Sequence, residues 1–261
     1  MIKLIIIISV FLNIFFLYFL NKKKIKKILF TSKIRKIDVA DVHEIFKLNK
    51  ISNNLSGPKE EAIIKSFSIS ADNNIVGMTS EYEAWIIASL SKISQNIFEF
   101  GTCSGKTTYL MALNSNDNSK ITSITLDPSE AISIAKRGND NKVSLRNIKN
   151  ESIYNNFLFS NTEVEKKINV IFQNSLELNE KKFEKKMDLI FIDGGHTYSI
   201  VKSDTEKAFK MLNSRGIILW HDYVPEKRSS KDVVRYIDEI SKVKDIQNIK
   251  NTSICYFKNS Y

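Results

Sequence analysis

Two acids and two histidines follow two short apolar runs in the second half of the chain. The run Leu-Ile-Phe-Ile stops at Asp193-Gly-Gly-His196, and the run Ile-Ile-Leu-Trp stops at His221-Asp222. Continuous apolar runs of this length are typical of parallel strands that are buried on both faces. The pattern between them is helical, so the segment predicts a strand, a helix and a second strand. The four polar residues would then lie at the carboxyl ends of the strands, where ligands bind in open α/β sheets.

A second motif lies upstream, where the apolar run Ile97-Phe-Glu99-Phe passes into Gly101-Thr-Cys-Ser-Gly105 and then into a helical pattern. Glycine lets the backbone approach a ligand closely, and a helix start offers free N–H groups. With Asp127 ending the next predicted strand, the arrangement fits a nucleoside site in which a carboxylate binds ribose hydroxyls. The same loop misses the Walker A pattern by one residue between its glycines. A P-loop-like nucleotide hydrolase is therefore the competing reading.

Together these motifs resemble the class I S-adenosylmethionine-dependent methyltransferases, in particular the metal-dependent sugar O-methyltransferases of macrolide pathways. The resemblance rests on Asp193-Gly-Gly-His196, on Asp204 in the following helix and on the Trp-His-Asp222-Tyr stretch, and it covers roughly residues 78–258. It implies a Rossmann-like α/β fold, with a seven-stranded, mostly parallel sheet and helices on both faces. It also implies S-adenosyl-L-methionine as cofactor, with a divalent metal such as Mg or Mn.

The resemblance also implies roles for individual residues. Asp193 and Asp222 would hold the metal with His221 as a third ligand, although the family usually has a carboxylate at that last position. His196 and Asp193 would act in catalysis, His196 by taking the proton of the acceptor, and Asp204 would orient His196. A metal-independent methyltransferase is the alternative. The residues implied for cofactor binding are Glu99, Gly101, Thr102, Gly105, Asp127 and Ser175.

The segment 129–167 is longer than a simple crossover between two strands and reads as two helices around a polar loop, the second over 153–159. Insertions of this kind often shape a substrate pocket. From the resemblance and the expected membrane attachment, the acceptor would be a hydroxyl of a saccharide or of a saccharide-bearing lipid.

The N-terminal stretch 4–20 is almost wholly apolar and just long enough to cross a bilayer as a helix. It predicts a single-pass membrane anchor, and the lysines after it place the following domain on the cytoplasmic side. A cleaved signal peptide is the rival reading, and a lumenal orientation is the alternative for a eukaryotic source. The predicted parts are an anchor over 1–21, a basic juxtamembrane linker over 22–57 that can lie on anionic headgroups, and a methyltransferase domain over 58–261.

The positive charge is concentrated in the same region. Of the net charge of +10, nine charges lie before Asp38, which leaves +1 for the rest of the chain. The domain after Asp38 therefore lacks the positive charge that would be the main argument for a nucleic-acid partner. Cys103 and Cys255 are the only cysteines, too few for a disulfide framework, so a reducing compartment is the simple reading. A membrane-attached binding module without catalytic activity remains a further alternative.

Overall fold

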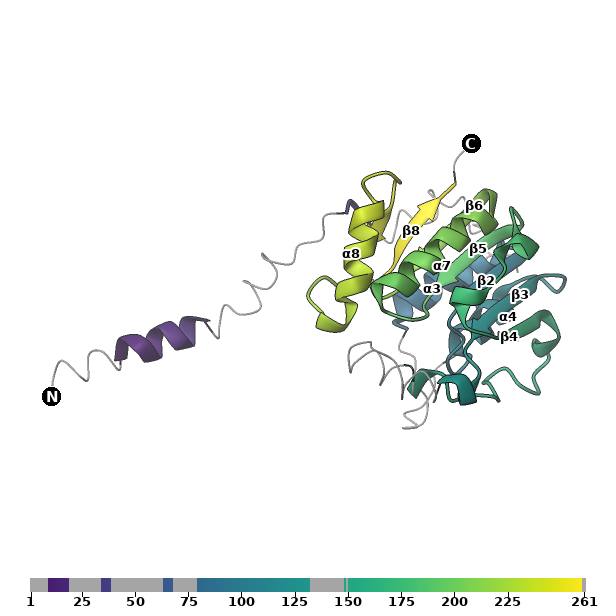
Figure 1. The fold of residues 1–261 in the computed structure, drawn as a ribbon, viewed down its shortest axis with the longest axis horizontal. Helices are drawn as coiled ribbons and strands as arrows, with labels where there is room; N and C mark the ends of the chain where they lie inside the picture. The colour runs from purple at the N-terminus through teal and green to yellow at the C-terminus, as the bar shows by residue number, and fades with distance from the viewer. Residues whose placement is uncertain are drawn as a thin grey trace, which may run out of the picture.

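The fold is that of a computed structural model. The model describes residues 9–18, 34–38, 63–67, 79–131, 148 and 150–259. Its centre is one sheet in the order β1-β7-β8-β6-β5-β2-β3-β4, in which β8 runs antiparallel to both of its neighbours and every other pair is parallel (Figure 1). The strands are β1 (Lys36–Ile37), β2 (Asn96–Phe100), β3 (Lys120–Thr125), β4 (Ile168–Phe172), β5 (Met187–Ile192), β6 (Leu212–Trp220), β7 (Gln247–Ile249) and β8 (Cys255–Lys258).

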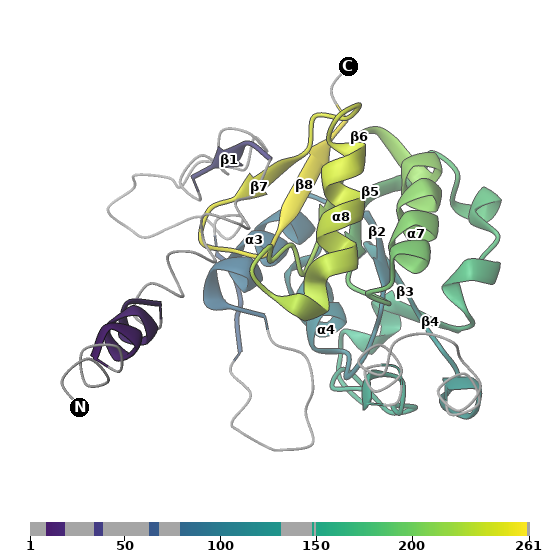
Figure 2. The same cartoon turned by 60° about the vertical axis from the view of Figure 1, so that its left-hand side comes forward.

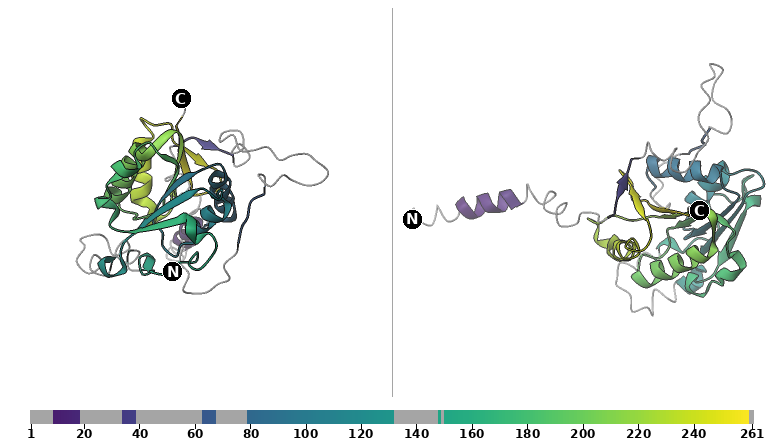
Figure 3. Two further views of the ribbon diagram at one scale, coloured as in Figure 1. Left: turned by 90° about the vertical axis from the view of Figure 1, so that its right-hand side faces the viewer. Right: turned by 90° about the horizontal axis from the view of Figure 1, so that it is seen from above.

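Helices cover both faces of this sheet, as the sequence predicted. Successive side chains of a strand point to opposite faces. Leu189 and Phe191 therefore pack with α3 (Glu81–Lys92) and α4 (Lys106–Asn114), while Ile190 and Ile192 pack with α7 (Tyr198–Met211) and α8 (Lys231–Ile240). The two helical layers are seen on opposite sides of the sheet in Figures 2 and 3. Short 3₁₀ turns complete the domain: η3 (Glu165–Lys167), η4 (Ser175–Glu177), η5 (Glu180–Phe183) and η6 (Arg228–Ser230).

The sheet has eight strands, one more than predicted. The additional strand, β1, comes from the segment predicted as a linker and pairs in parallel with β7, with Lys36 opposite Asn248. Ile34 and Ile37 are each only 6% exposed, and an ion pair of 2.9 Å joins the side chains of Asp38 and Lys250. Buried apolar residues beside a free sheet edge explain why this short segment joins the domain.

The helix predicted over 153–159 is not formed, and the chain makes turns there instead. Phe157 and Phe159 are two residues apart, a spacing that a helix cannot place on one face. Their rings stack with centroids 5.1 Å apart and are buried against Gly105 at the start of α4. The chain therefore buries both rings by leaving the helical path. Most of the polar loop of this insertion lies outside the described residues.

The prediction of a membrane anchor is contradicted. Residues 9–18, the described part of this stretch, are helical. In the described part of the chain, no helix is long and apolar enough to cross a membrane. The single-pass localisation with a cytoplasm-facing domain is therefore wrong. The rest of the apolar stretch and most of the basic linker lie outside the described residues, and the domain boundaries at 21 and 57 stay predictions.

Candidate active site

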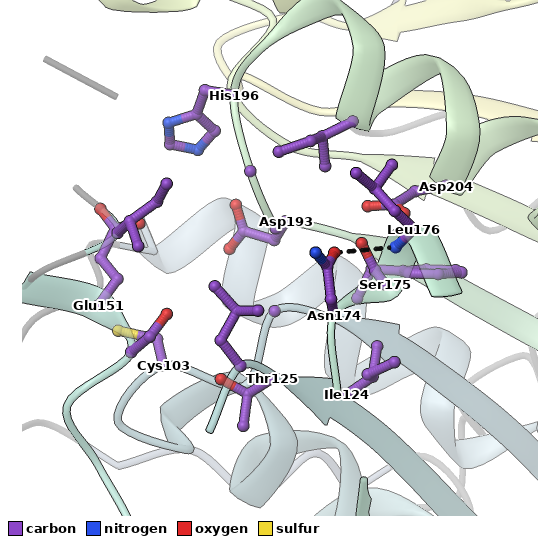
Figure 4. Close-up of a pocket in the computed structure, with 18 of the residues that line it drawn as sticks. Cys103, Ile124, Thr125, Glu151, Asn174, Ser175, Leu176, Asp193, His196 and Asp204 are labelled. Carbon is purple, nitrogen blue, oxygen red and sulfur yellow. Dashed lines mark hydrogen bonds between the residues drawn. The ribbon is translucent and has the colours of Figure 1, made fainter. Parts of the chain in front are cut away.

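The topology of the sheet fixes where a ligand can bind. From β2 the chain moves outward through β3 and β4, and it then returns to the other side of β2 as β5. Such a reversal leaves a crevice beyond the carboxyl ends of the two central strands. A cavity of about 190 Å³ lies there, lined by residues that follow β2, β3, β4 and β5 (Figure 4).

Gly101 forms the part of the cavity wall where two loops come closest together. Its φ of +102° lies in a region that residues with a side chain rarely adopt, and a Cβ on it would lie 2.4 Å from the carbonyl oxygen of Asp193. The backbone N–H of Asp193 donates to the carbonyl of Phe100 at 2.9 Å. Glycine is required at position 101 because the loop after β2 passes directly over the loop after β5.

Asp193, His196 and Asp222 form a compact group beside the cavity. His196 Nε2 lies 2.9 Å from Asp222 Oδ2, and one ligand atom from each of the three residues lies within 4.8 Å of the others. Asp222 has a φ of +61°, which is uncommon for a residue other than glycine. Strained backbone of this kind clusters at functional sites. This backbone conformation of Asp222 helps to direct its carboxylate towards His196.

His221 lies behind this group, among three carboxylates. Its Nδ1 is 3.1 Å from Asp193 Oδ1 and 3.7 Å from Asp222 Oδ2, and its Nε2 is 3.6 Å from Glu83 Oε2. Burial lowers the pKa of His221, but the charge of Asp193 and contacts with all three carboxylates outweigh burial and raise it well above its ordinary value. In the structure, His221 is therefore the cationic partner of the carboxylates, while the compact group includes His196 instead.

Glu83 is a site neighbour that sequence reasoning missed. α3 begins with a capping box, in which the N–H and the hydroxyl of Ser80 each donate to Glu83 at 2.8 Å. The N–H and hydroxyl of Ser253 also donate to Glu83, each at 2.7 Å. Burial raises the pKa of Glu83, but His221 and these hydrogen bonds reverse the effect and hold it well below its usual range. The capping spacing signalled the helix start, but no local pattern signalled the contact with His221.

The other end of the cavity is formed by η4 and α7. Asn174 caps the η4 turn, its Oδ1 accepting a hydrogen bond from the N–H of Leu176 at 3.1 Å. Figure 4 shows Asp204 beside Ser175 and Leu176, across the cavity from His196. The carboxylate that lies 2.9 Å from His196 is Asp222, and the orienting role of Asp204 towards His196 stays a prediction.

Of the residues predicted to bind the cofactor, Gly101 and Ser175 line the cavity. Thr102 is buried with its hydroxyl 2.7 Å from that of Ser123. Gly105 precedes α4 with a φ of +80°, and Asp127 accepts a hydrogen bond from the N–H of Ser129 at 2.8 Å. These three residues, like Glu99, do not line the cavity.

Glu99 is fully buried in the middle of the sheet. Its carboxyl group accepts hydrogen bonds from the hydroxyls of Thr108 and Ser123, the latter at 2.6 Å. Burial raises the pKa of Glu99 to about 8, although these two hydrogen bonds lower it. Inside the folded protein the carboxyl is therefore protonated over a pH range in which it would be ionised in the unfolded chain.

Glu99→Gln is expected to remove a pH dependence of stability. Because the folded protein holds this proton between the unfolded pKa of about 4.5 and the folded pKa of about 8, the free energy of unfolding falls as the pH rises through that window. Relative to its value at pH 5, the stability of the variant should exceed that of the wild type by up to about 5 kcal/mol at pH 9. Urea unfolding at pH 5, 7 and 9 measures this, and an equal fall in both proteins would contradict it.

Glu151, from the insertion, also lines the cavity and was not singled out from the sequence. Burial raises the pKa of Glu151, as do the charges of Asp193 and Asp222, while His196 lowers it. Figure 4 places Glu151 across the cavity from Asp193. A lone glutamate in a long polar segment carries no sequence signal, so only the fold identifies this fourth carboxyl group.

Comparisons with known proteins point to one enzyme class. A family described as "Methyltransferase domain" matches residues 98–223, which span the glycine loop, the compact group and the strands between them. No curated protein matches the sequence.

Solved structures with a similar chain path share little sequence. The O-methyltransferase TomG from Streptomyces achromogenes, in complex with SAM, is 13% identical with a TM-score of 0.47, over 90% of this chain and 95% of that chain. A putative caffeoyl-CoA O-methyltransferase from Staphylococcus aureus is 16% identical with a TM-score of 0.49, over 71% and 86%. An O-methyltransferase from Bacillus cereus, in complex with SAH, is 14% identical with a TM-score of 0.46, over 72% and 85%.

At these levels of similarity no residue role is transferred from the solved structures. The family match covers the same glycine loop that gave rise to the nucleotide-hydrolase reading, and it assigns the loop to a methyltransferase. The chain thus carries a methyltransferase domain over residues 98–223, in agreement with the class I, S-adenosylmethionine-dependent enzymes that its motifs resemble.

Proposed function

We propose that the protein transfers the methyl group of S-adenosyl-L-methionine to a hydroxyl group of a saccharide, with assistance from a divalent metal ion. The observation that carries the proposal is the pair of His196 and Asp222, 2.9 Å apart, beside Asp193 at the cavity. Methyl transfer to oxygen requires that an acceptor hydroxyl be aligned and lose its proton. An imidazole supported by a carboxylate can remove this proton.

The cofactor, when bound, supplies the electrophilic methyl carbon. Gly101 lines the cavity at the glycine loop, where the cofactor would meet the backbone, and Ser175 offers a hydroxyl at the far end of the cavity. His196 accepts the acceptor's proton at Nδ1, and Asp222, whose Oδ2 lies 2.9 Å from Nε2, holds the imidazolium that forms. The acids Glu151 and Asp193 accept hydrogen bonds from further hydroxyls, which favours a polyol such as a saccharide.

The donor set suits a hard or borderline divalent cation. Two carboxylates and an imidazole within 4.8 Å fit Mg or, better, Mn, because imidazole is a poorer ligand for Mg. Asp193 and Asp222 would hold the ion. Since His196 is kept for the proton, His221, whose Nδ1 faces both carboxylates, would be the third ligand once it has lost the proton that its carboxylate neighbours favour. Such an ion would lower the pKa of a bound hydroxyl, which is a poor nucleophile at neutral pH.

His196→Gln is expected to lower kcat by about 10² to 10⁴, the usual contribution of a general base. Burial lowers the pKa of His196, but Asp222 more than compensates and raises it above its ordinary value. A base acts in its neutral form, so kcat/KM in the wild type should rise with pH through a pKa above the ordinary 6.5 of histidine. A pH–rate profile of both proteins measures this. A profile that is flat from pH 6 to 9 in the wild type would contradict the assignment.

The first test is calorimetric titration of the protein with S-adenosylhomocysteine, with and without Mn²⁺ or Mg²⁺, and with ATP as a control. Binding of S-adenosylhomocysteine but not of ATP is expected. Binding of ATP alone would favour the nucleotide hydrolase, and binding of neither would favour a module without this catalytic activity.

The acceptor is tested next by following methyl transfer to a panel of neutral sugars, catechols and carboxylic acids. We expect turnover with sugars and loss of turnover on chelation of the metal. Turnover with catechols alone would overturn the saccharide proposal. Full turnover in the presence of a chelator would overturn the metal proposal while leaving the methyltransferase intact.

A further inference from the structure

Asp204 is a buried acid that the reaction described above does not use. It lies on the buried face of α7, is 1% exposed, and lines the cavity. Its Oδ1 has no hydrogen-bond partner among the described residues. A buried carboxyl oxygen without a partner costs free energy, and buried polar atoms of this kind call for an explanation.

The neighbouring lysine does not supply the missing partner. Lys207 follows three residues later on the same helix face, a spacing that favours a pair with an acid. Its Nζ instead donates to the backbone carbonyls of Ser175 and Leu176, the latter at 2.8 Å. Lys207 thus fixes the η4 turn against α7, and the Oδ1 of Asp204 remains unpaired at the cavity wall.

The chemistry of this end of the cavity differs from that around His196. Its lining includes the apolar side chains of Ile124 and Leu176, together with Ser175 and Asp204 (Figure 4). Apolar walls with a polar group at one edge suit a flat heteroaromatic ring with an N–H donor on its rim. A saccharide, with hydroxyls all around its ring, would leave most of them unpaired against these walls.

We infer that Asp204 binds the adenine edge of S-adenosyl-L-methionine, its Oδ1 accepting a hydrogen bond from the exocyclic amine. The inference rests on the proposed function, since it concerns the same cofactor. Burial raises the pKa of Asp204 to about 7, although Ser175 and Lys207 lower it. The neutral acid is therefore accessible near neutral pH, and its hydroxyl can donate to the adjacent ring nitrogen. One carboxyl group then meets both the donor and the acceptor of the base edge.

The test compares two ligands that differ only at this edge. S-inosylhomocysteine carries a carbonyl oxygen in place of the amine of S-adenosylhomocysteine, and its neighbouring ring nitrogen is protonated, so the donor and the acceptor are exchanged. Calorimetry of the wild-type protein should show that S-adenosylhomocysteine binds at least about tenfold more tightly. Asp204→Ala should weaken S-adenosylhomocysteine binding about tenfold to a hundredfold and abolish the preference. Glu206→Ala, on the exposed face of the same helix, is the matched control and should change neither value.

Asp204→Asn provides a second test of the inference if the alanine variant fails to fold. Its side-chain amide can meet the adenine edge in one orientation and the inosine edge in the other. The variant should therefore keep S-adenosylhomocysteine binding within a few fold and gain affinity for S-inosylhomocysteine. An unchanged preference in both Asp204 variants would overturn the inference while leaving the methyltransferase proposal standing. Absence of S-adenosylhomocysteine binding to the wild type would overturn both.

Discussion

Asp193→Ala is expected to reduce turnover on the order of a thousandfold while S-adenosylhomocysteine still binds. The Asp193 carboxylate belongs to the compact group with His196 and Asp222, and its Oδ1 lies 3.1 Å from His221. Removing it takes away a proposed metal ligand and leaves the buried imidazole of His221 with one carboxylate fewer. The fold should survive, because Asp193 is tied to β2 through its backbone N–H, which the substitution keeps.

The matched control for this variant is Asp188→Asn, at the opposite end of the same strand. Asp188 accepts hydrogen bonds from the backbone N–H groups of Gln95 and Asn96 and lies far along β5 from the cavity. The Asp188→Asn variant should have a changed free energy of unfolding but an unchanged turnover rate per folded molecule. Single-turnover rates with saturating cofactor separate chemistry from binding. Normal turnover in Asp193→Ala would show that the metal and catalytic assignments of this residue are wrong.

Gly101→Ala is expected to cost more than about 3 kcal/mol of folding stability and to prevent cofactor binding. The new Cβ would meet the carbonyl oxygen of Asp193 at 2.4 Å, and backbone on both sides leaves no flexible group to give way. The positive φ of Gly101 adds a further penalty for any side chain. Urea unfolding and calorimetric titration of the same preparation measure the two effects.

Gly195→Ala is the comparison for Gly101→Ala, because it creates a clash with a side chain instead of with the backbone. Its Cβ would also lie close to a neighbour, 2.8 Å from Ile200, but that neighbour is the end of a side chain that can rotate. The expected cost is within about 1.5 kcal/mol. Equal losses of stability in the two variants would show that the backbone contact between the loops after β2 and β5 is not what requires glycine at position 101.

The sheet and its covering helices were largely predictable because local patterns determine them. Buried parallel strands read as continuous apolar runs, and each central strand ends at a glycine or an acid that the sequence displays. The failures have equally local causes. Two residues of β1 are too few to give a pattern, and the apolar residues of the insertion were read as helical although Phe157 and Phe159 alternate.

The candidate site was predictable only where it coincides with strand ends. Asp193 and Asp222 could be recognised from the sequence because a carboxylate directly after an apolar run is unusual. Glu83 and Glu151 could not be recognised, because each looks like an ordinary helical or surface acid until distant segments are brought together. Asp204 was noted through the resemblance, but its place at the cavity wall was not predicted. The membrane anchor was predicted from the length and composition of the apolar N-terminal stretch alone, whereas no helix in the described part of the chain is long and apolar enough to cross a membrane.

The pairing of β1 with β7 joins two segments that are far apart in the chain. Asp38 and Lys250, joined by an ion pair across this edge, are 212 residues apart in the chain. Contacts of such long sequence separation form slowly, since a large loop must close before they stabilise anything. During synthesis Ile34 and Ile37 leave the ribosome well before their partners exist. This edge is therefore the last part of the sheet that translation allows to close, and its protection against hydrogen exchange would report completion of the domain.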